Sequence, residues 1–412
     1  MEYGLIGEVL KHSFSKEIHS RLFDYDYELC EVKKDELDGF LKRRDFKAIN
    51  VTIPYKQAVI PYLYGIDSAA EKIGAVNTVV NKDGRLYGYN TDFSGLKAML
   101  VKNRMCLENK KVLILGSGGT SKTAFAVAEN MGAKEIYLVS RFEKEGFITY
   151  GDAYENHFDA DGIINTTPCG MFPKTGVSAV DIKNFKNLSF VCDVIYNPLC
   201  SKLVTDAKKL GINACGGLYM LVSQAAFAAE KFTGQTVAES KITEIFSEVK
   251  SEKENIVLIG MPGCGKTTVG KILSKKTGKK FVDTDKIIEE KAGVTISEFF
   301  KTHSEEDFRD LESAVTADIS KEQGLIIATG GGAVLREENV DLLKENGRLC
   351  FIDRPLDKLI ATDDRPLSSN RADLEKRYRE RYGIYVSRAD IKVDGSINPN
   401  SVAELILKEF SN

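Results

Sequence analysis

The chain has 412 residues, of which 43% are hydrophobic and 28% are charged, and its formal net charge is −3. This balance is typical of globular domains with a sizeable core, and it excludes a strongly basic nucleic-acid-binding protein. The length alone predicts two or three domains.

Eight cysteines are spread along the chain, and no two of them form a Cys-x-x-Cys pair. This distribution fits a reducing compartment better than a disulfide framework or a zinc site, so we expect a cytoplasmic protein. The first residues lack the pattern of a signal peptide, and no apolar run reaches the ~18 residues that span a membrane. We therefore expect small-molecule substrates and neither a membrane nor a nucleic-acid partner, while the oligomeric state stays open.

Polar segments follow predicted strands four times within the first 92 residues. They contain Ser13 with Ser15, Asn50 to Lys56, Asn77 with Thr78, and Asn90 to Asp92. Open α/β sheets bind ligands at strand ends, so this recurrence predicts a polar ligand site. We expect Pro54 to begin a helix that carries Lys56 in its first turn. Helix capping is the alternative for Ser15 and for the segment from Asn90.

A glycine-rich turn follows the predicted strand 111–115 and precedes a predicted helix at 124–131 and a strand at 135–139. This order predicts a Rossmann-type βαβ unit. The second strand is followed by Ser140 and Arg141, where a reader of NAD carries an acidic residue. Arg141 suits the 2′-phosphate of NADP, although a surface arginine is the alternative.

A second nucleotide motif, Gly260 to Thr267, lies between a predicted strand at 256–259 and a helix from 269. Strand, G-x-x-x-x-G-K-T and helix together predict a phosphate-binding loop. Lys266 suits the β- and γ-phosphates, and Thr267 suits Mg²⁺. Loop backbone N–H groups and the helix N-terminus also favour anions. The loop residues concerned are Gly263, Cys264, Gly265, Lys266, Thr267 and Thr268.

Downstream of this loop, Asp283 and Asp285 stand at a predicted strand end, where one carboxylate suits Mg²⁺ and the other an attacking hydroxyl. A capped helix start is the alternative for this pair. A strand at 325–328 ends in three glycines, which allow close approach of a ligand. The polar stretch 362–370 is predicted to form a lid. A charged joint at 251–254 separates this unit from the preceding one.

Residues 1–250 resemble shikimate dehydrogenases. The matching motifs are Ser13-x-Ser15, Asn50-Val51-Thr52-Ile53-Pro54-Tyr55-Lys56, Asn77-Thr78, Asn90-Thr91-Asp92, Gly116-Ser117-Gly118-Gly119, Asn165-Thr166-Thr167-Pro168, Tyr196-Asn197-Pro198, and Gly217 with Met220 to Gln224.

The resemblance implies a catalytic pair, Lys56 and Asp92. It implies that substrate is held by Ser13, Ser15, Thr52, Asn77, Tyr196 and Gln224. It also implies that NADP is held by Gly116, Gly118, Gly119, Thr120, Ser140, Arg141, Thr166 and Gly217.

From about Asn255 the chain resembles shikimate kinases. The resemblance implies that Asp285 acts on the acceptor hydroxyl, that Arg309 and Arg381 hold its carboxylate, and that Asp283 lies near Mg²⁺. It places Gly331 and Gly332 against the substrate ring and Arg365 on the lid over the ATP phosphates.

The predicted fold class is therefore α/β in three parts: a substrate domain at 1–100 completed by helices at about 216–250, a Rossmann-type NADP domain at 101–215, and a P-loop kinase domain with a parallel sheet at 255–412. The predicted function is reduction of 3-dehydroshikimate with NADPH and phosphorylation of shikimate with ATP. One alternative is a quinate-type dehydrogenase joined to another small-polyol kinase. The other is a non-enzymatic nucleotide sensor, which is disfavoured because Lys56, Asp92 and Lys266 are all present.

Overall fold

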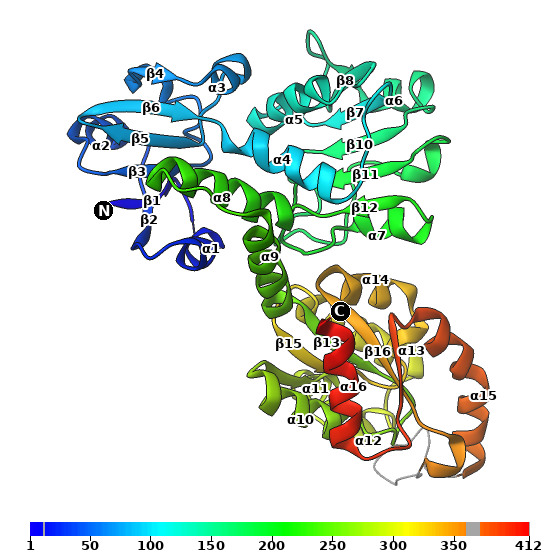
Figure 1. Cartoon of the computed structure of the whole chain (residues 1–412). Helices are drawn as coiled ribbons and strands as arrows, with labels where there is room; N and C mark the ends of the chain where they lie inside the picture. Colours follow the sequence, from blue (N-terminus) through cyan, green and yellow to red (C-terminus); the bar gives the residue numbers. More distant parts are fainter. Residues whose placement is uncertain (11–12, 360–370, 412) are drawn as a thin grey trace. The chain divides into compact units, whose positions relative to one another are not determined.

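The structure, a computed structural model, describes residues 1–10, 13–359 and 371–411. The described chain divides into two units (Figure 1). The first unit comprises residues 1–171, 177–196 and 203–249, and the second comprises 172–176, 197–202 and the described residues from 250 onward. Both units are α/β, as the sequence predicts.

The first unit contains a mixed six-stranded sheet that begins at the N-terminus. Its strand order is β2-β1-β3-β5-β6-β4, in which β5 runs antiparallel to both β3 and β6. Polar residues follow the ends of β3 and β6, where the sequence places the substrate site. The strands are β1 (Tyr3–Gly7), β2 (Tyr27–Glu31), β3 (Ala48–Val51), β4 (Gly65–Ile66), β5 (Thr78–Lys82) and β6 (Arg85–Tyr89).

The second sheet of this unit is wholly parallel, in the order β12-β11-β10-β7-β8-β9. The predicted Rossmann-type βαβ unit is confirmed as β7, α5 (Gly119–Asn130) and β8, because β7 and β8 pair in parallel. The strands are β7 (Lys111–Leu115), β8 (Glu135–Ser140), β9 (Ile148–Thr149), β10 (Gly162–Asn165), β11 (Phe190–Asp193) and β12 (Asn213–Cys215).

Two long helices, α4 (Thr91–Lys102) and α8 (Leu218–Thr233), pack along each other between the two sheets (Figure 1). Gly95 of α4 makes this approach possible, because a Cβ there would lie 2.8 Å from both the Gln224 Cβ and the Met220 carbonyl oxygen. The remaining helices are α1 (Ser15–Leu22), α2 (Leu37–Arg43), η1 (Ile60–Tyr62), α3 (Ser68–Ile73), α6 (Tyr150–Asn156), η2 (Ile182–Asn184), α7 (Lys202–Lys209), which extends from the second unit, and α9 (Glu239–Lys253), which continues into it.

The prediction that a helix begins at Pro54 is wrong. Residues 53–59 form successive turns, and only the short 3₁₀ helix η1 follows them. The Tyr55 side chain is anchored instead by its hydroxyl, which donates to the Val32 carbonyl in the core of the first sheet. Lys56 is therefore presented by a turn that is fixed through its buried neighbour, and an argument from a helix dipole does not apply to it.

His19 of α1 is fully buried under the first sheet. Its ring stacks on Tyr27 with centroids 3.9 Å apart, and Nδ1 lies 2.6 Å from the Tyr25 hydroxyl. Among the described residues, its Nε2 has no hydrogen-bond partner. Burial lowers the pKa of His19 to about 3, and the nearby Asn50 side chain only partly offsets this effect. The imidazole therefore stays neutral in the folded protein at pH values where the unfolded chain binds a proton.

We expect acid to destabilise the first unit through His19. Its pKa lies at about 3 when folded and near 6.5 when unfolded, so stability is lost as pH falls below 6.5. The free energy of opening should fall by about 2 kcal/mol between pH 6.5 and pH 5 from this group. Hydrogen exchange of the α1 and β2 amides measures it. A His19→Phe variant should lack this component, and an identical pH dependence in both proteins would contradict the assignment.

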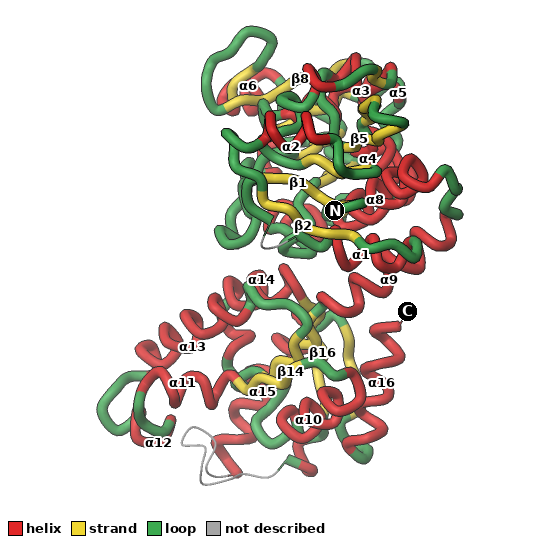
Figure 2. Tube along the Cα trace, turned by 90° about the vertical axis from the view of Figure 1, so that its left-hand side faces the viewer, coloured by secondary structure: helices red, strands yellow, loops and turns green. Residues whose placement is uncertain are grey.

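The second unit has a five-stranded parallel sheet in the order β14-β15-β13-β16-β17. Figure 2 shows this sheet between α10 and α16 on one side and α11, α13 and α14 on the other. The predicted parallel sheet behind the phosphate-binding loop is thus confirmed. The strands are β13 (Asn255–Ile259), β14 (Lys280–Asp283), β15 (Leu325–Ala328), β16 (Gly347–Asp353) and β17 (Ile391–Asp394).

The helices of this unit cover both faces of the sheet. They are α10 (Lys266–Thr277), α11 (Thr284–Ala292), α12 (Ile296–Phe299), α13 (Glu305–Ile319), η3 (Ala333–Leu335), α14 (Glu337–Asn346), η4 (Leu356–Lys358), α15 (Arg371–Arg388) and α16 (Pro399–Ser411).

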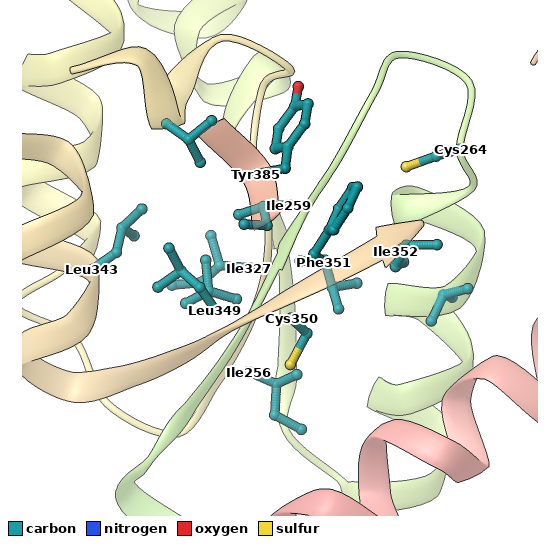
Figure 3. Packing of buried hydrophobic residues seen from close by; sticks show 14 of the residues in the cluster. Ile256, Ile259, Cys264, Ile327, Leu343, Leu349, Cys350, Phe351, Ile352 and Tyr385 are labelled. Carbon is teal, nitrogen blue, oxygen red and sulfur yellow. The ribbon is translucent and has the colours of Figure 1, made fainter. Parts of the chain in front are cut away.

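Fully buried side chains of the central strands fill the space between these layers (Figure 3). Phe351 of β16 stacks on Tyr385 of α15 with ring centroids 5.2 Å apart, and both rings are buried. The apolar side chains of β13 are buried on both faces of the strand, as expected for the centre of a parallel sheet. This core holds the phosphate-binding loop that follows β13.

The charged joint predicted at 251–254 is not a separate linker, because α9 continues through Lys253. The Lys279 ammonium group donates to the carbonyl oxygens of Ser251, Glu252 and Glu254 at 2.7, 3.0 and 2.6 Å. A cation is favourable at this end of a helix, where carbonyl groups lack intrahelical partners. Burial lowers the pKa of Lys279 to about 8, although the neighbouring glutamates oppose the shift.

Within the described ranges, we find no helix with the length and apolar character needed to cross a membrane.

Candidate active sites

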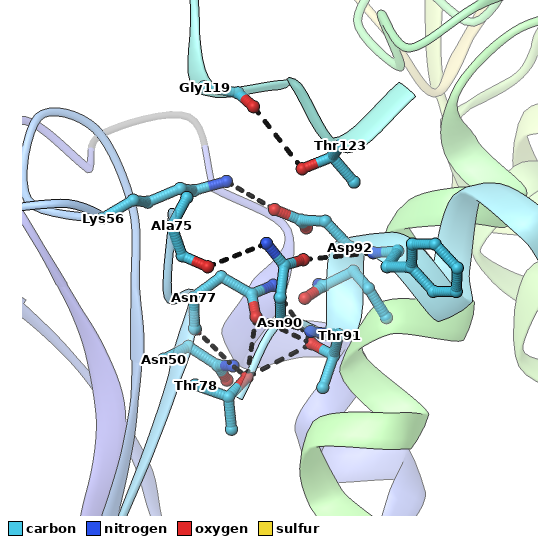
Figure 4. A network of polar contacts seen from close by, with 12 residues as sticks. Asn50, Lys56, Ala75, Asn77, Thr78, Asn90, Thr91, Asp92, Gly119 and Thr123 are labelled. Atoms are coloured by element: carbon cyan, nitrogen blue, oxygen red, sulfur yellow. Dashed lines mark hydrogen bonds and ion pairs between the residues drawn. The ribbon is translucent and has the colours of Figure 1, made fainter. Parts of the chain in front are cut away.

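Lys56 and Asp92 form the ion pair that the sequence predicts. Lys56 Nζ lies 2.6 Å from Asp92 Oδ2, and their side chains are 21% and 11% exposed (Figure 4). Lys56 comes from the turn after β3, and Asp92 comes from the first turn of α4. The pair is thus sheltered yet reachable from solvent, which suits an ammonium group that delivers a proton to a bound substrate.

Asn77 lies beside this pair within a buried polar network. Its Oδ1 accepts from the backbone N–H of Thr91 at 2.7 Å, and its Nδ2 donates to Thr91 Oγ1 at 3.0 Å. Thr91 directly precedes Asp92, so one short segment carries both the carboxylate that pairs with Lys56 and the anchor of Asn77. The buried residues Asn50 and Thr78 extend this network (Figure 4). Sequence analysis placed both in polar segments at strand ends but assigned neither residue a role of its own.

The other predicted substrate residues lie in smaller contact groups. Ser13 Oγ donates to Ser15 Oγ at 3.0 Å, and between them the Phe14 ring lies 5.2 Å from the ring of Tyr196. Gln224 packs against Gly95, one turn along α4 from Asp92. The methyl group of Thr52 lies against Gly7, at the end of β1. Burial raises the pKa of Tyr196 above its ordinary value, so the phenol remains a proton donor at neutral pH.

The predicted NADP loop follows β7 and begins α5. Gly116 has φ of 119°, and a Cβ there would lie 2.7 Å from the Thr166 hydroxyl, so only glycine fits. Gly118 and Gly119 instead face open space, which leaves their backbone accessible to a phosphate at the helix N-terminus. Thr120 lies in the first turn of that helix.

Two further predicted cofactor residues lie at the same edge of the sheet, because Ser140 ends β8 and Arg141 directly follows it. Ser140 is buried and its hydroxyl accepts from the Phe142 N–H at 3.3 Å, whereas Arg141 is exposed and stands 5.8 Å from the Phe142 ring centroid. Gly217 has a separate structural reason to be glycine, because a Cβ would lie 2.1 Å from the Val194 carbonyl oxygen.

The phosphate-binding loop has the backbone that its glycines predict. Gly260, Gly263 and Gly265 all have positive φ, at 145°, 79° and 102°. Lys266 Nζ donates to the carbonyl oxygens of Gly260 and Met261 at 2.9 and 3.1 Å, so it lies across the loop. Cys264 is buried beneath it, and Thr268 is exposed.

Oxygen ligands suitable for Mg²⁺ meet at the start of α10. Thr267 Oγ1 donates to Asp283 Oδ2 at 3.0 Å, and Asp283 ends β14. Asp283 also caps α11, because its Oδ1 accepts from the Asp285 backbone N–H at 3.2 Å. The alternative interpretation of this pair, a capped helix start, is therefore correct for Asp283 Oδ1. A hydroxyl and a carboxylate beside a phosphate loop fit Mg²⁺, which binds few protein ligands and otherwise uses water and phosphate.

An acidic and basic cluster faces the three glycines after β15. Arg309 donates to Glu312 Oε2 at 2.6 Å and to Glu305 Oε1 at 3.1 Å. Glu312 is buried, and its other oxygen has no hydrogen-bond partner among the described residues. Burial raises the pKa of Glu312, and the nearby Asp285 adds to the effect while Arg309 opposes it. The sequence-based site assignment did not include Glu312, although it lies one helical turn beyond Arg309.

The glycine triplet lies against these side chains. A Cβ on Gly330 would lie 2.6 Å from Glu312 Oε1 and 2.7 Å from Asp285 Oδ1, and one on Gly332 would lie 2.0 Å from Arg309 Nη1. The predicted residues Asp285, Arg309 and Gly332 are therefore brought together. A Cβ on Gly331 would touch Pro262 of the phosphate loop at 3.0 Å.

Arg381 joins the same site from α15. Its Nη1 donates to the Gly331 carbonyl oxygen at 3.1 Å, and the hydroxyl of Tyr385 donates to the same oxygen. Burial lowers the pKa of the Arg381 guanidinium below its ordinary value. A cavity of about 340 Å³ is lined by Arg381, Glu305 and Arg377, among others. The predicted lid, with Arg365, lies outside the described residues.

The two sites therefore define a nicotinamide-type dehydrogenase with a Rossmann-type sheet, joined in one chain to a P-loop phosphotransferase. Comparison with known proteins agrees on both parts. The family model for the shikimate dehydrogenase substrate binding domain matches residues 5–79, and the model for shikimate kinase matches residues 262–411.

Individual relatives support the first assignment. A shikimate dehydrogenase (NADP(+)) from Clostridium perfringens is 40% identical over 266 residues, which cover 60% of this chain and 98% of the relative. A solved chorismate mutase/shikimate 5-dehydrogenase fusion protein from Clostridium acetobutylicum has 39% identity and a TM-score of 0.57, covering 60% of this chain and 96% of that one. The shikimate 5-dehydrogenase from Thermus thermophilus, solved in complex with NADP(H) and shikimate, has 27% identity and a TM-score of 0.55, with coverage of 60% and 99%.

Over this N-terminal part the chain belongs to the shikimate dehydrogenase family, and a shikimate kinase domain follows it. The predicted fold class, the bifunctional assignment and the use of NADP and ATP are confirmed at this level, and the two alternative functions are not favoured.

Proposed function

We propose that the first unit reduces 3-dehydroshikimate to shikimate, with Lys56 as the proton donor to the carbonyl oxygen at C3. Bound NADPH supplies the hydride. The observation that carries this assignment is the 2.6 Å contact between Lys56 and Asp92. Asp92 holds the ammonium group in place until the carbonyl oxygen takes its proton. Ser13, Ser15, Thr52, Asn77, Tyr196 and Gln224 hold the substrate hydroxyls and carboxylate.

In the second unit, Asp285 orients the C3 hydroxyl of shikimate toward the γ-phosphate of ATP. Arg309 and Arg381 hold the substrate carboxylate, because buried guanidinium groups recognise carboxylates with paired hydrogen bonds. The Gly330 to Gly332 backbone lies against the ring. Lys266 and the loop N–H groups stabilise the negative charge that develops on the transferred phosphoryl group. Bound Mg²⁺ would neutralise phosphate charge, and Thr267 and Asp283 are the residues that would hold it.

The discriminating experiment mixes purified protein with 3-dehydroshikimate, NADPH, ATP and Mg²⁺, and follows NADPH loss and ADP formation separately. We expect NADPH loss without ATP, and ADP formation only after shikimate is added or formed. Quinate and 3-dehydroquinate serve as competing substrates, and a preference for them would favour the quinate-type alternative. Chelation of divalent cations should stop ADP formation and leave NADPH oxidation intact.

Arg141→Ala is expected to weaken NADPH binding about tenfold or more while NADH binding changes little. A charge-assisted contact with the 2′-phosphate is worth roughly 1.5–3 kcal/mol, and NADH lacks that phosphate. Fluorescence titration with each cofactor measures the difference. Lys144→Ala is the matched control, because Lys144 is also exposed and follows the same strand. Equal losses of binding affinity for NADPH and NADH would show that Arg141 does not bind the 2′-phosphate.

A further inference from the structure

A chain of buried hydrogen bonds leads from α1 and β2 to Asn77 at the dehydrogenase site. The Tyr27 hydroxyl donates to Asn50 Oδ1 at 2.8 Å, and Asn50 Nδ2 donates to Thr78 Oγ1 at 3.1 Å. Thr78 Oγ1 in turn lies 3.1 Å from Asn77 Oδ1. All four residues are buried, and they come from three strands and the junction before β5 (Figure 4 shows the chain from Asn50 onward).

The donor direction of this chain is set at its first member. A phenol carries one O–H, and that of Tyr27 is directed to Asn50 Oδ1, which therefore acts as the acceptor end of the Asn50 amide. Burial raises the pKa of Tyr27 well above its ordinary value, so the proton stays on the phenol. The neutral imidazole of His19 stacks on the same ring and restricts its rotation. With Oδ1 fixed toward Tyr27, the Asn50 amide must present its Nδ2 donors to Thr78.

The direction is then passed on by Thr78. Because its hydroxyl accepts from Asn50, its single proton is directed onward, where Asn77 Oδ1 lies at 3.1 Å and Thr91 Oγ1 at 3.2 Å. The same Asn77 oxygen also accepts from the backbone N–H of Thr91, which cannot reverse its role. Turning the Asn77 amide over would place its NH₂ group against the Thr91 N–H and would lose the acceptor that Thr78 faces. The orientation of Asn77 is thus determined by the network rather than by a ligand.

We propose that Tyr27, Asn50 and Thr78 are positioning residues that hold the Asn77 carboxamide with an N–H group toward the substrate. One Nδ2 hydrogen is directed to Thr91 Oγ1, and the second is the donor that the substrate meets. This position then recognises an oxygen that accepts a hydrogen bond, and it discriminates against analogues that lack that oxygen. The inference rests on the proposed role of Asn77 in substrate binding.

The test compares Thr78→Val, which removes the hydroxyl at nearly constant shape, with Thr78→Ser, which keeps it, and with Tyr27→Phe, which removes the first donor. Tyr62→Phe is the control, because it also removes a phenol hydrogen bond in this unit, to Asp38, outside the chain. For each protein we would measure kcat and KM for shikimate, the concentration of NADPH-binding sites, and the kinase rate. Shikimate analogues that lack the C4 or the C5 hydroxyl form a second arm.

We expect KM for shikimate to rise about 3- to 10-fold in Thr78→Val and Tyr27→Phe, the range for one misdirected neutral hydrogen bond, with kcat changed less than twofold. Thr78→Ser and Tyr62→Phe should stay within twofold of wild type. One of the two deoxy analogues should lose its sensitivity to Thr78→Val.

An unchanged KM in both Thr78→Val and Tyr27→Phe would overturn the proposal, as would equal losses in Thr78→Ser. Fewer NADPH-binding sites at constant KM would show that the network serves stability alone. Absence of dehydrogenase activity in the wild-type protein, with its kinase intact, would instead refute the proposed function.

Discussion

Replacing Lys56 by methionine is expected to slow the reduction of 3-dehydroshikimate by ~10²–10⁴, the range for loss of a general acid. Methionine keeps most of the apolar stem of lysine but has no proton to deliver. The loss should appear in kcat more than in KM, because the proton is needed as the carbonyl oxygen gains charge in the transition state. Initial rates of NADPH oxidation at saturating substrate measure it.

Two controls separate this effect from a general loss of folding. The kinase rate of the same protein should be unchanged. Lys72 also pairs with a carboxylate, that of Glu129 at 2.9 Å, but on the surface of the same unit. The Lys72→Met variant should therefore reduce 3-dehydroshikimate at nearly the wild-type rate. Near-normal turnover in Lys56→Met would show that another group supplies the proton.

Asp285→Asn is expected to lower the rate of phosphoryl transfer by ~10²–10⁴ while ATP binding changes little. Asparagine has the same shape but cannot accept the hydroxyl proton or polarise it as a carboxylate does. The Asp285 carboxylate lies beside Gly330, whereas Asp283 is the carboxylate that contacts Thr267 at the phosphate loop. ADP formation under saturating shikimate gives the rate, and calorimetric titration with an ATP analogue gives the affinity.

Asp318→Asn provides the matched change, because Asp318 is exposed and pairs with Lys291 at 2.6 Å on the surface of the same unit. It should leave both quantities near wild type. If the Asp285 variant instead lost ATP affinity by the same factor as rate, Asp285 would belong to the metal–nucleotide complex and not to the acceptor hydroxyl.

Features encoded within one strand–loop–helix segment were predictable from the sequence. Gly116 in the first nucleotide loop, and Gly260, Gly263 and Gly265 in the second, stand where the backbone has positive φ, and this need is local. The pair of Lys56 and Asp92 was also predicted, although its partners lie 36 residues apart, because each has a recognisable motif around it.

Side chains that act through distant partners were not predictable. Asn50 lies in a short strand, and its partners Tyr27 and Thr78 are 23 and 28 residues away. Nothing near Asn50 in the sequence indicates which way its amide faces. Glu312 did leave a signal, because a carboxylate three residues after Arg309 on a helix shares its face. That spacing is common on solvated helices, and only burial reveals its meaning here.

Two local predictions were wrong for a common reason. Proline permits a helix start, yet after Pro54 the buried Tyr55 ties the chain to the first sheet and turns form instead. The charged run 251–254 has the composition of a linker, yet Lys279 binds its carbonyl groups and α9 continues through it. In both places a tertiary contact outweighed the local preference of the sequence.

The glycine triplet beside Arg309 bears on how resistance to an inhibitor would arise. A Cβ at Gly330 or Gly332 collides with Glu312 or Arg309, whose charged ends are buried and joined at 2.6 Å, so neither moves aside cheaply. Any amino-acid substitution of these two glycines would therefore disturb Glu312 or Arg309 together with the inhibitor's contact. A compound that binds this stretch of backbone would therefore leave few resistance substitutions there, whereas one that depends on exposed side chains would leave many.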